Sequence, residues 1–294
     1  GIPISGGNSG VLGVRPDIRI VGHTIPAPTI GCNFFPDHGD MALETSRGFF
    51  NNTASNSVRL RNTIGHELGH GIGLNHVIPV DQTKLMEPSI SASFDGPQED
   101  DILAVNRGYG DRNESGQGND SFATATSLGN LVPNASLGTT QVSIDDDSDT
   151  DIYGFTLTGS ADVSIDVDPT GTTYQSGPQN GTPTTFNAEA QSDLAFDVLA
   201  DDEMTVLATV SAAGLGQTES LANINLAAGD YFLRVSGTAN MVQMYDISLS
   251  AVAATPPPPM LDDLADTLIG RSGDDTIIAS LGNDFVFGNS GQES

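Results

Sequence analysis

The pattern of hydrophobic and polar positions differs between two parts of the chain, with helical spacing in the first part and short β-rich runs in the second. Between residues 57 and 71, Leu60, Ile64 and Leu68 recur every fourth residue. This spacing predicts a helix whose buried face carries the aliphatic row. A second helix is expected after Pro97, because proline suits the first helical position and the acidic side chains that follow favour the positive end of a helix.

Beyond residue 113 the pattern changes to short β-rich runs separated by turns. The clearest runs are residues 151–157, 163–167, 194–199 and 231–235. No helical period accompanies them, so an all-β sandwich is expected. Four consecutive prolines near residue 257 predict a stiff, extended spacer. The chain is therefore expected to be multidomain, with domains at residues 1–112, 113–253 and 261–294 and a proline-rich linker at 254–260.

The acidic charge is concentrated in the second part of the chain. The net charge is −28, and residues 113–294 hold 26 acidic but only two basic side chains. Nucleic acid and an anionic membrane surface are excluded as partners, because both would be repelled. No window approaches 18 consecutive apolar residues, which excludes a membrane-spanning helix. The single cysteine, Cys32, excludes an intramolecular disulfide.

The first predicted helix carries residues with metal-binding spacing. At about 100° per residue, His66 and His70 lie together and away from the aliphatic row. A glycine-rich stretch can then end the helix and bring His76 back toward them. Three neutral nitrogens with one open coordination position are typical of a catalytic zinc. Glu67 is placed to take a proton from water and deliver it to a leaving amine.

The residues from His66 to His76 read H-E-x-x-H-x-x-G-x-x-H, and they match the metzincin zinc signature at all five defining positions. Residues 85–88, which include Met86, resemble the Met-turn that lies beneath the metal in that clan. Residues 17–20 and 39–44 resemble two sheet strands of the matrixins, a family of the same clan.

The resemblance implies that residues 1–112 form an α+β catalytic domain of the metzincin type with a short N-terminal part. His66, His70 and His76 would bind one catalytic zinc, Glu67 would act as general base and then acid, and Met86 would support the site. In metzincins the edge strand of the sheet pairs with the substrate, so the expected ligand is a protein or peptide in extended form. The oligomeric state is left open.

Several alternatives accompany this interpretation. The zinc domain could be vestigial, in a catalytically inactive adhesin or matrix-binding protein, although an intact Glu67 argues against decay. The substrate could also be a non-protein amide. His23, His38 and Asp40 are either remnants of a second, structural zinc site or solvated loop groups. Cys32 either resembles a propeptide's inhibitory cysteine or is an inert, buried thiol between two sheet strands.

The β-rich region contains a strongly acidic loop. The opening Asn119-Asp120 and the strand at 151–155 resemble bacterial pre-peptidase C-terminal domains, which accompany secreted peptidases. Four aspartates alternate in the loop and are candidate calcium ligands, because a hard cation would relieve their repulsion: Asp145, Asp147, Asp149 and Asp151. The alternative is a solvated acidic loop.

The last part of the chain carries a repeat of nine residues. Two units, 270–278 and 279–287, have glycine, then aspartate, then an aliphatic residue in register, and residues 261–269 fit the pattern loosely. The candidate calcium ligands are Asp266, Asp275 and Asp284. The units resemble the calcium-binding nonapeptide repeats of RTX proteins, which implies a short parallel β-roll and secretion by a bacterium. A flexible acidic tail is the alternative. The combined expectation is a secreted, extracellular zinc endopeptidase with structural calcium.

Overall fold

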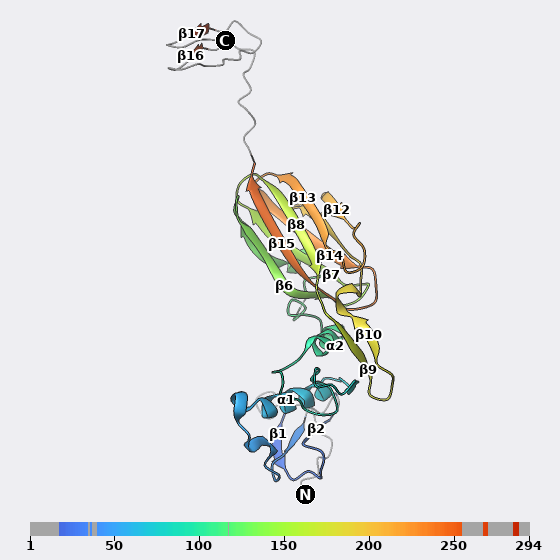
Figure 1. Ribbon diagram of the computed structural model, residues 1–294. Coiled ribbons are helices and arrows are strands. Elements are labelled where there is room, and N and C mark those ends of the chain that lie inside the picture. Colours follow the sequence, from blue (N-terminus) through green and yellow to red (C-terminus); the bar gives the residue numbers. More distant parts are fainter. Residues whose placement is uncertain are drawn as a thin grey trace. The chain divides into compact units, whose positions relative to one another are not determined.

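The computed structural model describes residues 18–34, 36, 40–116, 118–254, 267–269 and 285–287. The chain forms two compact units, Gly1–Val252 and Ala253–Ser294. The described residues are mostly β-sheet with two α-helices, and the expected β-sandwich is confirmed (Figure 1). The domain boundaries predicted at 112 and 253 stay predictions, and the structure itself divides the chain after Val252.

A small sheet opens the described part of the chain. Its strands are β1 (Ile20–His23), β3 (Met41–Glu44) and β2 (Gly31–Asn33), in that order across the sheet. β1 runs parallel to β3, and β2 runs antiparallel to it. The strand expected at 39–44 corresponds to β3, whereas the one expected at 17–20 overlaps β1 only at Ile20. β2 therefore lies at one edge of this sheet among the described strands.

Helix α1 (Ala54–Gly71) corresponds to the first predicted helix. Its residues 55–57 have left-handed backbone angles, so the regular right-handed turns follow them. The prediction that the aliphatic row forms the buried face was wrong, because Leu68 is 37% exposed while Asn62 and His66 are buried. The polar face packs inward since the Asn62 amide donates to the carbonyls of Ser91 and Phe94. Satisfied hydrogen bonds make burial of a polar face tolerable.

Helix α2 (Glu99–Tyr109) is the second predicted helix. Gln98 and Asp101 form a capping box at its N-terminus. The Asp101 carboxylate also accepts the N–H groups of Leu85 and Met86, at 3.0 and 3.1 Å. This helix start therefore fixes the backbone of the loop that carries Met86.

The β-sandwich consists of a five-stranded and a four-stranded sheet. The five-stranded sheet has the order β12 (Val206–Val210), β11 (Leu194–Ala200), β14 (Gly229–Gly237), β7 (Thr150–Leu157) and β5 (Thr126–Leu131). The four-stranded sheet has the order β13 (Glu219–Leu226), β8 (Ala161–Pro169), β15 (Gln243–Ala253) and β6 (Ser136–Ile144). Alternate residues of these strands face inward and form one apolar core, as period-two patterning requires. All four predicted β-rich runs lie within strands.

A hairpin of the β-rich region pairs with the segment that follows helix α1. Its strands β9 (Thr173–Pro178) and β10 (Thr184–Asn187) are antiparallel, and β9 also pairs with the short strand β4 (Val77–Ile78). Figure 1 shows this hairpin beside α2. Strand β4 directly follows His76, so the hairpin reaches the segment that carries the predicted metal ligands.

The second unit is described at β16 (Thr267–Ile269) and β17 (Phe285–Phe287), which pair in parallel. The candidate ligands Asp266, Asp275 and Asp284 lie outside the described residues, as does His38. The β-roll stays a prediction.

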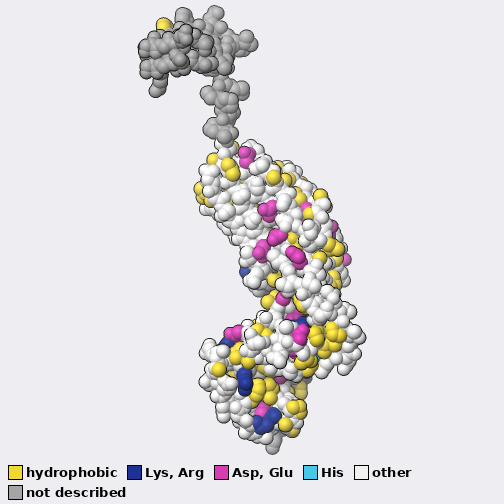
Figure 2. Space-filling model, in the orientation of Figure 1, with side chains coloured by type: hydrophobic (Ala, Val, Ile, Leu, Met, Phe, Trp, Pro, Cys, Tyr) yellow, Lys and Arg dark blue, Asp and Glu magenta, His cyan; other side chains and the backbone are white. Residues whose placement is uncertain are grey.

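The surface repeats the charge asymmetry of the sequence. On the face shown in Figure 2, acidic side chains lie along the sandwich, whereas most basic side chains lie near α1 and the first sheet. Among the described residues, none of the helices is long and apolar enough to span a membrane.

Candidate functional site

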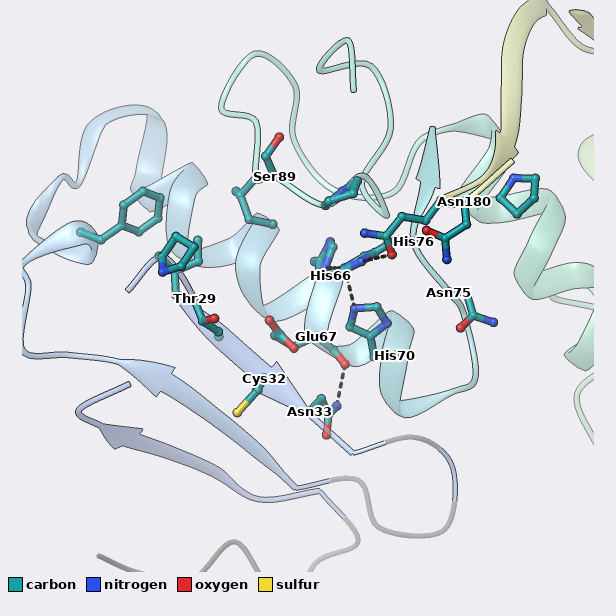
Figure 3. A pocket seen from close by; sticks show the side chains of 18 of the residues that line it. Thr29, Cys32, Asn33, His66, Glu67, His70, Asn75, His76, Ser89 and Asn180 are labelled. Atoms are coloured by element: carbon teal, nitrogen blue, oxygen red, sulfur yellow. Dashed lines mark hydrogen bonds between the residues drawn. The ribbon is translucent and has the colours of Figure 1, made fainter. Parts of the chain in front are cut away.

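Three histidines converge at the C-terminal end of α1. His66 and His70 project from the helix, and His76 returns after the turn that ends it (Figure 3). The Nε2 atom of His76 lies 3.1 Å from the Nε2 atoms of both His66 and His70. The structure therefore brings together the three residues that the spacing selects.

Hydrogen bonds fix the orientation of each ring. Nδ1 of His66 donates to the carbonyl of Leu85 at 2.7 Å, and Nδ1 of His70 donates to the carbonyl of Leu74 at 2.8 Å. Nδ1 of His76 faces Oε1 of Gln179 at 3.1 Å. Because these oxygens only accept, each proton resides on Nδ1, and the three Nε2 lone pairs point at one another.

This arrangement fits a zinc ion. Tetrahedral ligands at about 2.0–2.1 Å from zinc have nitrogens roughly 3.3 Å apart, close to the separation observed here. Three facing lone pairs repel without a cation between them. Burial lowers the pKa of His66 to about 4 and also lowers the pKa of His70. These rings are therefore neutral at neutral pH, the state in which imidazole binds metal.

Glu67 lies beside the histidines with its carboxylate toward the cleft (Figure 3). The side chain is 5% exposed, and its Oε2 has no hydrogen-bond partner. Burial raises its pKa to about 7. A Cβ at Gly31 would lie 2.5 Å from Oε1 of Glu67, so a larger residue at this position of β2 would displace the carboxylate. With its pKa in this range, the Glu67 carboxyl group can gain and lose a proton near neutral pH.

Met86 lies against helix α1 at Gly69, the residue before His70. It is 2% exposed, and a Cβ at Gly69 would come within 2.4 Å of its sulfur. The next residue, Glu87, accepts backbone N–H groups of Gln82, Thr83 and Lys84. Glu87 is fully buried in its own loop, so the loop keeps a fixed shape and the cleft wall begins at Pro88.

A cleft of about 1110 Å³ surrounds the histidines. One side is the segment 28–33, which includes β2, and another is formed by Pro88, Ser89 and Ile90. The hairpin turn at residues 178–181 forms a further part of the wall. This volume is slightly above the range of roughly 300–1,000 Å³ that is usual for small-molecule sites.

Cys32 has a different position from the one predicted. It lies within β2 rather than between strands, and it is partly exposed and lines the cleft. Burial, and secondarily the charge of Glu67, raise the pKa of its thiol. The expectation of a buried thiol was therefore wrong, although alternation along β2 directs its sulfur away from Glu67, which faces Gly31 (Figure 3).

The second zinc site considered for His23, His38 and Asp40 finds no support among the described residues. The Asp40 carboxylate pairs with the guanidinium of Arg19. Neither His23 nor Asp40 belongs to a group of ligand atoms close enough to share an ion.

A second cluster of ligand atoms joins the acidic loop to the start of the sandwich. Carboxylate oxygens of Glu114, Asp149 and Asp151 lie within 4.8 Å of one another. Asp145 is adjacent, since its N–H donates to Asp149 at 2.7 Å. Asp147 is exposed and lies outside the cluster. Of the four aspartates predicted to bind calcium, two therefore meet, and Glu114 joins them.

The carboxylate cluster has unsatisfied buried atoms. Asp151 is fully buried, and its Oδ1 has no partner, while its other oxygen accepts the hydroxyl of Tyr245. Asn119 is also fully buried, and neither its amide oxygen nor its amide nitrogen has a partner. Burial and mutual repulsion raise the pKa of Glu114 and Asp145 to about 7. The cluster is an unfavourable arrangement unless protons or a cation neutralise it.

Sequence reasoning missed three residues of these sites. Glu114 was not considered as a ligand, and Asn119 was noted only for its resemblance to the opening of pre-peptidase C-terminal domains. The sequence carried no signal for Gln179, since it lies 103 residues after His76. Its proximity comes from the pairing of β4 with β9, which the local pattern cannot reveal.

Comparisons with known proteins agree with this geometry. Residues 24–110 match the matrixin family model, and residues 262–292 match the model of the RTX calcium-binding nonapeptide repeat in four copies. The first match implies zinc and the second implies calcium. A comparison with curated proteins found no significant match.

Two solved structures resemble part of the chain at low identity. One is the pre-peptidase C-terminal domain of a collagenase from Bacillus anthracis, which is 18% identical to this chain. The alignment covers 43% of this chain and 95% of that chain, with a TM-score of 0.27. The other is PliG, a periplasmic inhibitor of g-type lysozyme from Aeromonas hydrophila, with 14% identity, coverages of 43% and 99%, and a TM-score of 0.22. These scores are too low to carry an argument. The chain thus combines a matrixin-type region at residues 24–110 with RTX-type calcium-binding repeats at residues 262–292.

Proposed function

We propose that the protein is a zinc-dependent endopeptidase. The observation that carries this proposal is the convergence of three Nε2 lone pairs beside a buried, unpaired Glu67 carboxylate in an open cleft. His66, His70 and His76 hold the metal, and Met86 packs beneath them. A zinc ion bound there supplies Lewis-acid chemistry and lowers the pKa of water toward about 7.

Glu67 performs the proton transfers. Its carboxylate accepts a proton from the attacking water and then delivers that proton to the amine that leaves. A carboxylate buried to this degree exchanges protons near neutral pH, which suits both steps. The hydrogen bond from the Asn33 side chain to the Glu67 carbonyl, at 2.6 Å, ties this turn of α1 to β2.

The substrate is a protein or peptide in extended form. Strand β2 is one of the two edges of its sheet among the described strands, so its free side can pair with an extended backbone. The cleft runs between that edge and the segment 88–90. A peptide bond positioned there lies next to both Glu67 and the histidines.

Calcium is proposed as a structural ion at two places. The cluster of Glu114, Asp149 and Asp151 supplies carboxylate oxygens, which calcium prefers. The RTX-type repeats supply the second place. Such repeats fold where calcium is plentiful, which supports secretion from a bacterium into the extracellular medium.

The test is hydrolysis of casein and denatured collagen by the full chain and by Glu67→Gln. The variant keeps the size of the side chain and all three histidines, so it is expected to bind zinc normally. Its kcat/KM should fall roughly 10²–10⁴-fold, the usual contribution of a general base. Asp166→Asn, an exposed carboxylate on β8, is the matched control and should retain full activity.

The outcomes are distinct. Loss of activity both on zinc chelation and in Glu67→Gln supports the peptidase. Activity that survives Glu67→Gln contradicts the assignment of the base. Stoichiometric zinc with no hydrolysis of any protein substrate would favour the inactive binding protein instead.

A further inference from the structure

One of the three histidines is oriented by a different part of the chain from the other two. His66 and His70 donate to backbone carbonyls of Leu85 and Leu74, both of which belong to the matrixin-type region at residues 24–110. His76 is oriented instead by the side chain of Gln179. That side chain comes from the hairpin of the β-rich region (Figure 3 shows its neighbour Asn180 above His76).

The backbone register places Gln179 beside His76. Val77 lies opposite Pro178 and Ile78 opposite Gly177 in the β4–β9 ladder. The N–H of Gln179 also donates to the carbonyl of His76 at 3.2 Å. Both the backbone and the side chain of Gln179 therefore contact His76, and the regular register of the β4–β9 ladder is sufficient to place them there.

The hairpin is held in this place at its base. The Glu99 carboxylate of α2 accepts the N–H of Thr172 at 2.8 Å and also its hydroxyl. A small apolar cluster packs the hairpin onto α2 and consists of Leu103, Ala188, Val242 and Met244, with Tyr174 and Phe186 against them. The turn is closed by the N–H of Gly181, which donates to the carbonyl of Pro178 at 2.7 Å.

We propose that this hairpin completes the metal site within the same chain, with Gln179 as a positioning residue for His76. Oε1 of Gln179 keeps the proton of His76 on Nδ1 and the lone pair of Nε2 directed at the metal position. The inference rests on the proposed zinc site but not on peptidase activity. Residues that hydrogen-bond a metal-binding histidine affect metal affinity about 10–100-fold. Gln179 is exposed, and water can replace it in part, so about tenfold is expected.

The experiment measures the zinc dissociation constant of the full chain by competition with a chromogenic chelator. Gln179→Met keeps the length of the side chain but removes the acceptor, and it should weaken zinc binding about tenfold. Gln179→Glu retains an acceptor and should bind zinc at least as tightly as the original chain. Gln175→Met makes the same change on the same hairpin, where the side chain bonds Thr185 instead, and should have no effect.

A structural explanation is tested in the same series. The melting temperature of the zinc-free Gln179→Met variant should equal that of the original chain, because the ladder and the apolar cluster are untouched. Equal zinc affinities of Gln179→Met and the original chain would overturn the inference and leave the proposed function intact. Failure of the original chain to bind zinc would overturn the proposed function itself. Weakening in both Gln179→Met and Gln179→Glu would also contradict the role of the acceptor.

Discussion

The two clusters of ligand atoms in the first unit are organised in opposite ways. In the histidine cluster, each ring donates one hydrogen bond outward and directs a neutral nitrogen inward. In the carboxylate cluster, Glu114 and Asp151 have buried oxygens without partners, and their neighbours carry the same charge. The first cluster keeps its shape through its own hydrogen bonds, whereas the second is compact only because the strands around it fold.

The difference indicates what a metal contributes at each place. A site whose rings are already oriented by hydrogen bonds keeps its shape without the metal, so a metal stabilises it only through its affinity for the folded state. A site of unpaired carboxylates gains stability, because a cation removes repulsion and satisfies buried oxygens. Removal of zinc should therefore abolish activity while the protein stays folded, whereas removal of calcium should weaken the fold itself.

The largest expected effect is on zinc binding. His70→Ala removes one of three protein ligands and should lose about a quarter to a third of a typical zinc-binding free energy. This loss corresponds to roughly 10²–10⁴-fold weaker zinc binding. The melting temperature of the zinc-free protein should change little, since His70 is only partly buried. Chelator competition and a thermal scan check both statements. His23→Ala, outside the cluster, is the control, and a large loss of zinc-free stability in His70→Ala would break the comparison.

Calcium should raise the melting temperature of the first unit by about 5–10 °C at a hundredfold excess over its dissociation constant, since that excess contributes about 2.7 kcal/mol. The substitution Asp149→Asn should abolish this rise. Asp147→Asn in the same loop should leave it unchanged, because Asp147 is exposed and outside the cluster. A rise that persists in Asp149→Asn would assign the stabilisation to the C-terminal repeats.

The carboxylate cluster should also respond to pH. The pKa of Glu114 is raised to about 7, above its value in an unfolded chain of about 4.3. The folded state therefore binds an extra proton between about pH 4.5 and 7, and stability decreases as pH rises through this window. Without calcium, Glu114→Gln should melt a few degrees above the original chain at pH 8 and together with it at pH 5. With calcium at pH 8 the order should reverse; an unchanged order would exclude Glu114 as a ligand.

The smallest expected effect concerns the base of the hairpin. Glu99→Ala removes two exposed hydrogen bonds to Thr172, and zinc affinity should fall less than about threefold, because the apolar cluster and the β4–β9 ladder still hold the hairpin. Chelator competition on this variant beside Gln179→Met measures the ratio. A larger loss in Glu99→Ala than in Gln179→Met would mean that hairpin position matters more than the acceptor.

Local patterns predicted the parts of the molecule that depend on nearby residues. The spacing of His66, His70 and His76 depends on one helix and one turn, so the sequence indicated their convergence. The β-rich runs alternate with period two and indicated the sandwich. The face of α1 was predicted wrongly, because a hydrophobic pattern does not show that Asn62 satisfies its amide on two carbonyls.

Long-range pairing explains most of what was missed. Gln179 reaches His76 through a ladder between segments a hundred residues apart. Glu114 meets Asp149 and Asp151, and the carbonyl of Asn119 accepts the N–H of Ile152, through contacts between segments distant in the sequence. The position of Cys32 also depended on a strand too short, at three residues, for any alternation to show.

The single cysteine gives the cleft a natural reporter. Because Cys32 is partly exposed on β2 at the border of the cleft, a thiol-reactive fluorophore has one attachment point in the whole chain, on the strand that is proposed to pair with substrate. Its raised pKa makes labelling slow at neutral pH and faster in mild alkali. Emission from such a label would follow occupancy of the cleft directly, even in variants that no longer turn over substrate.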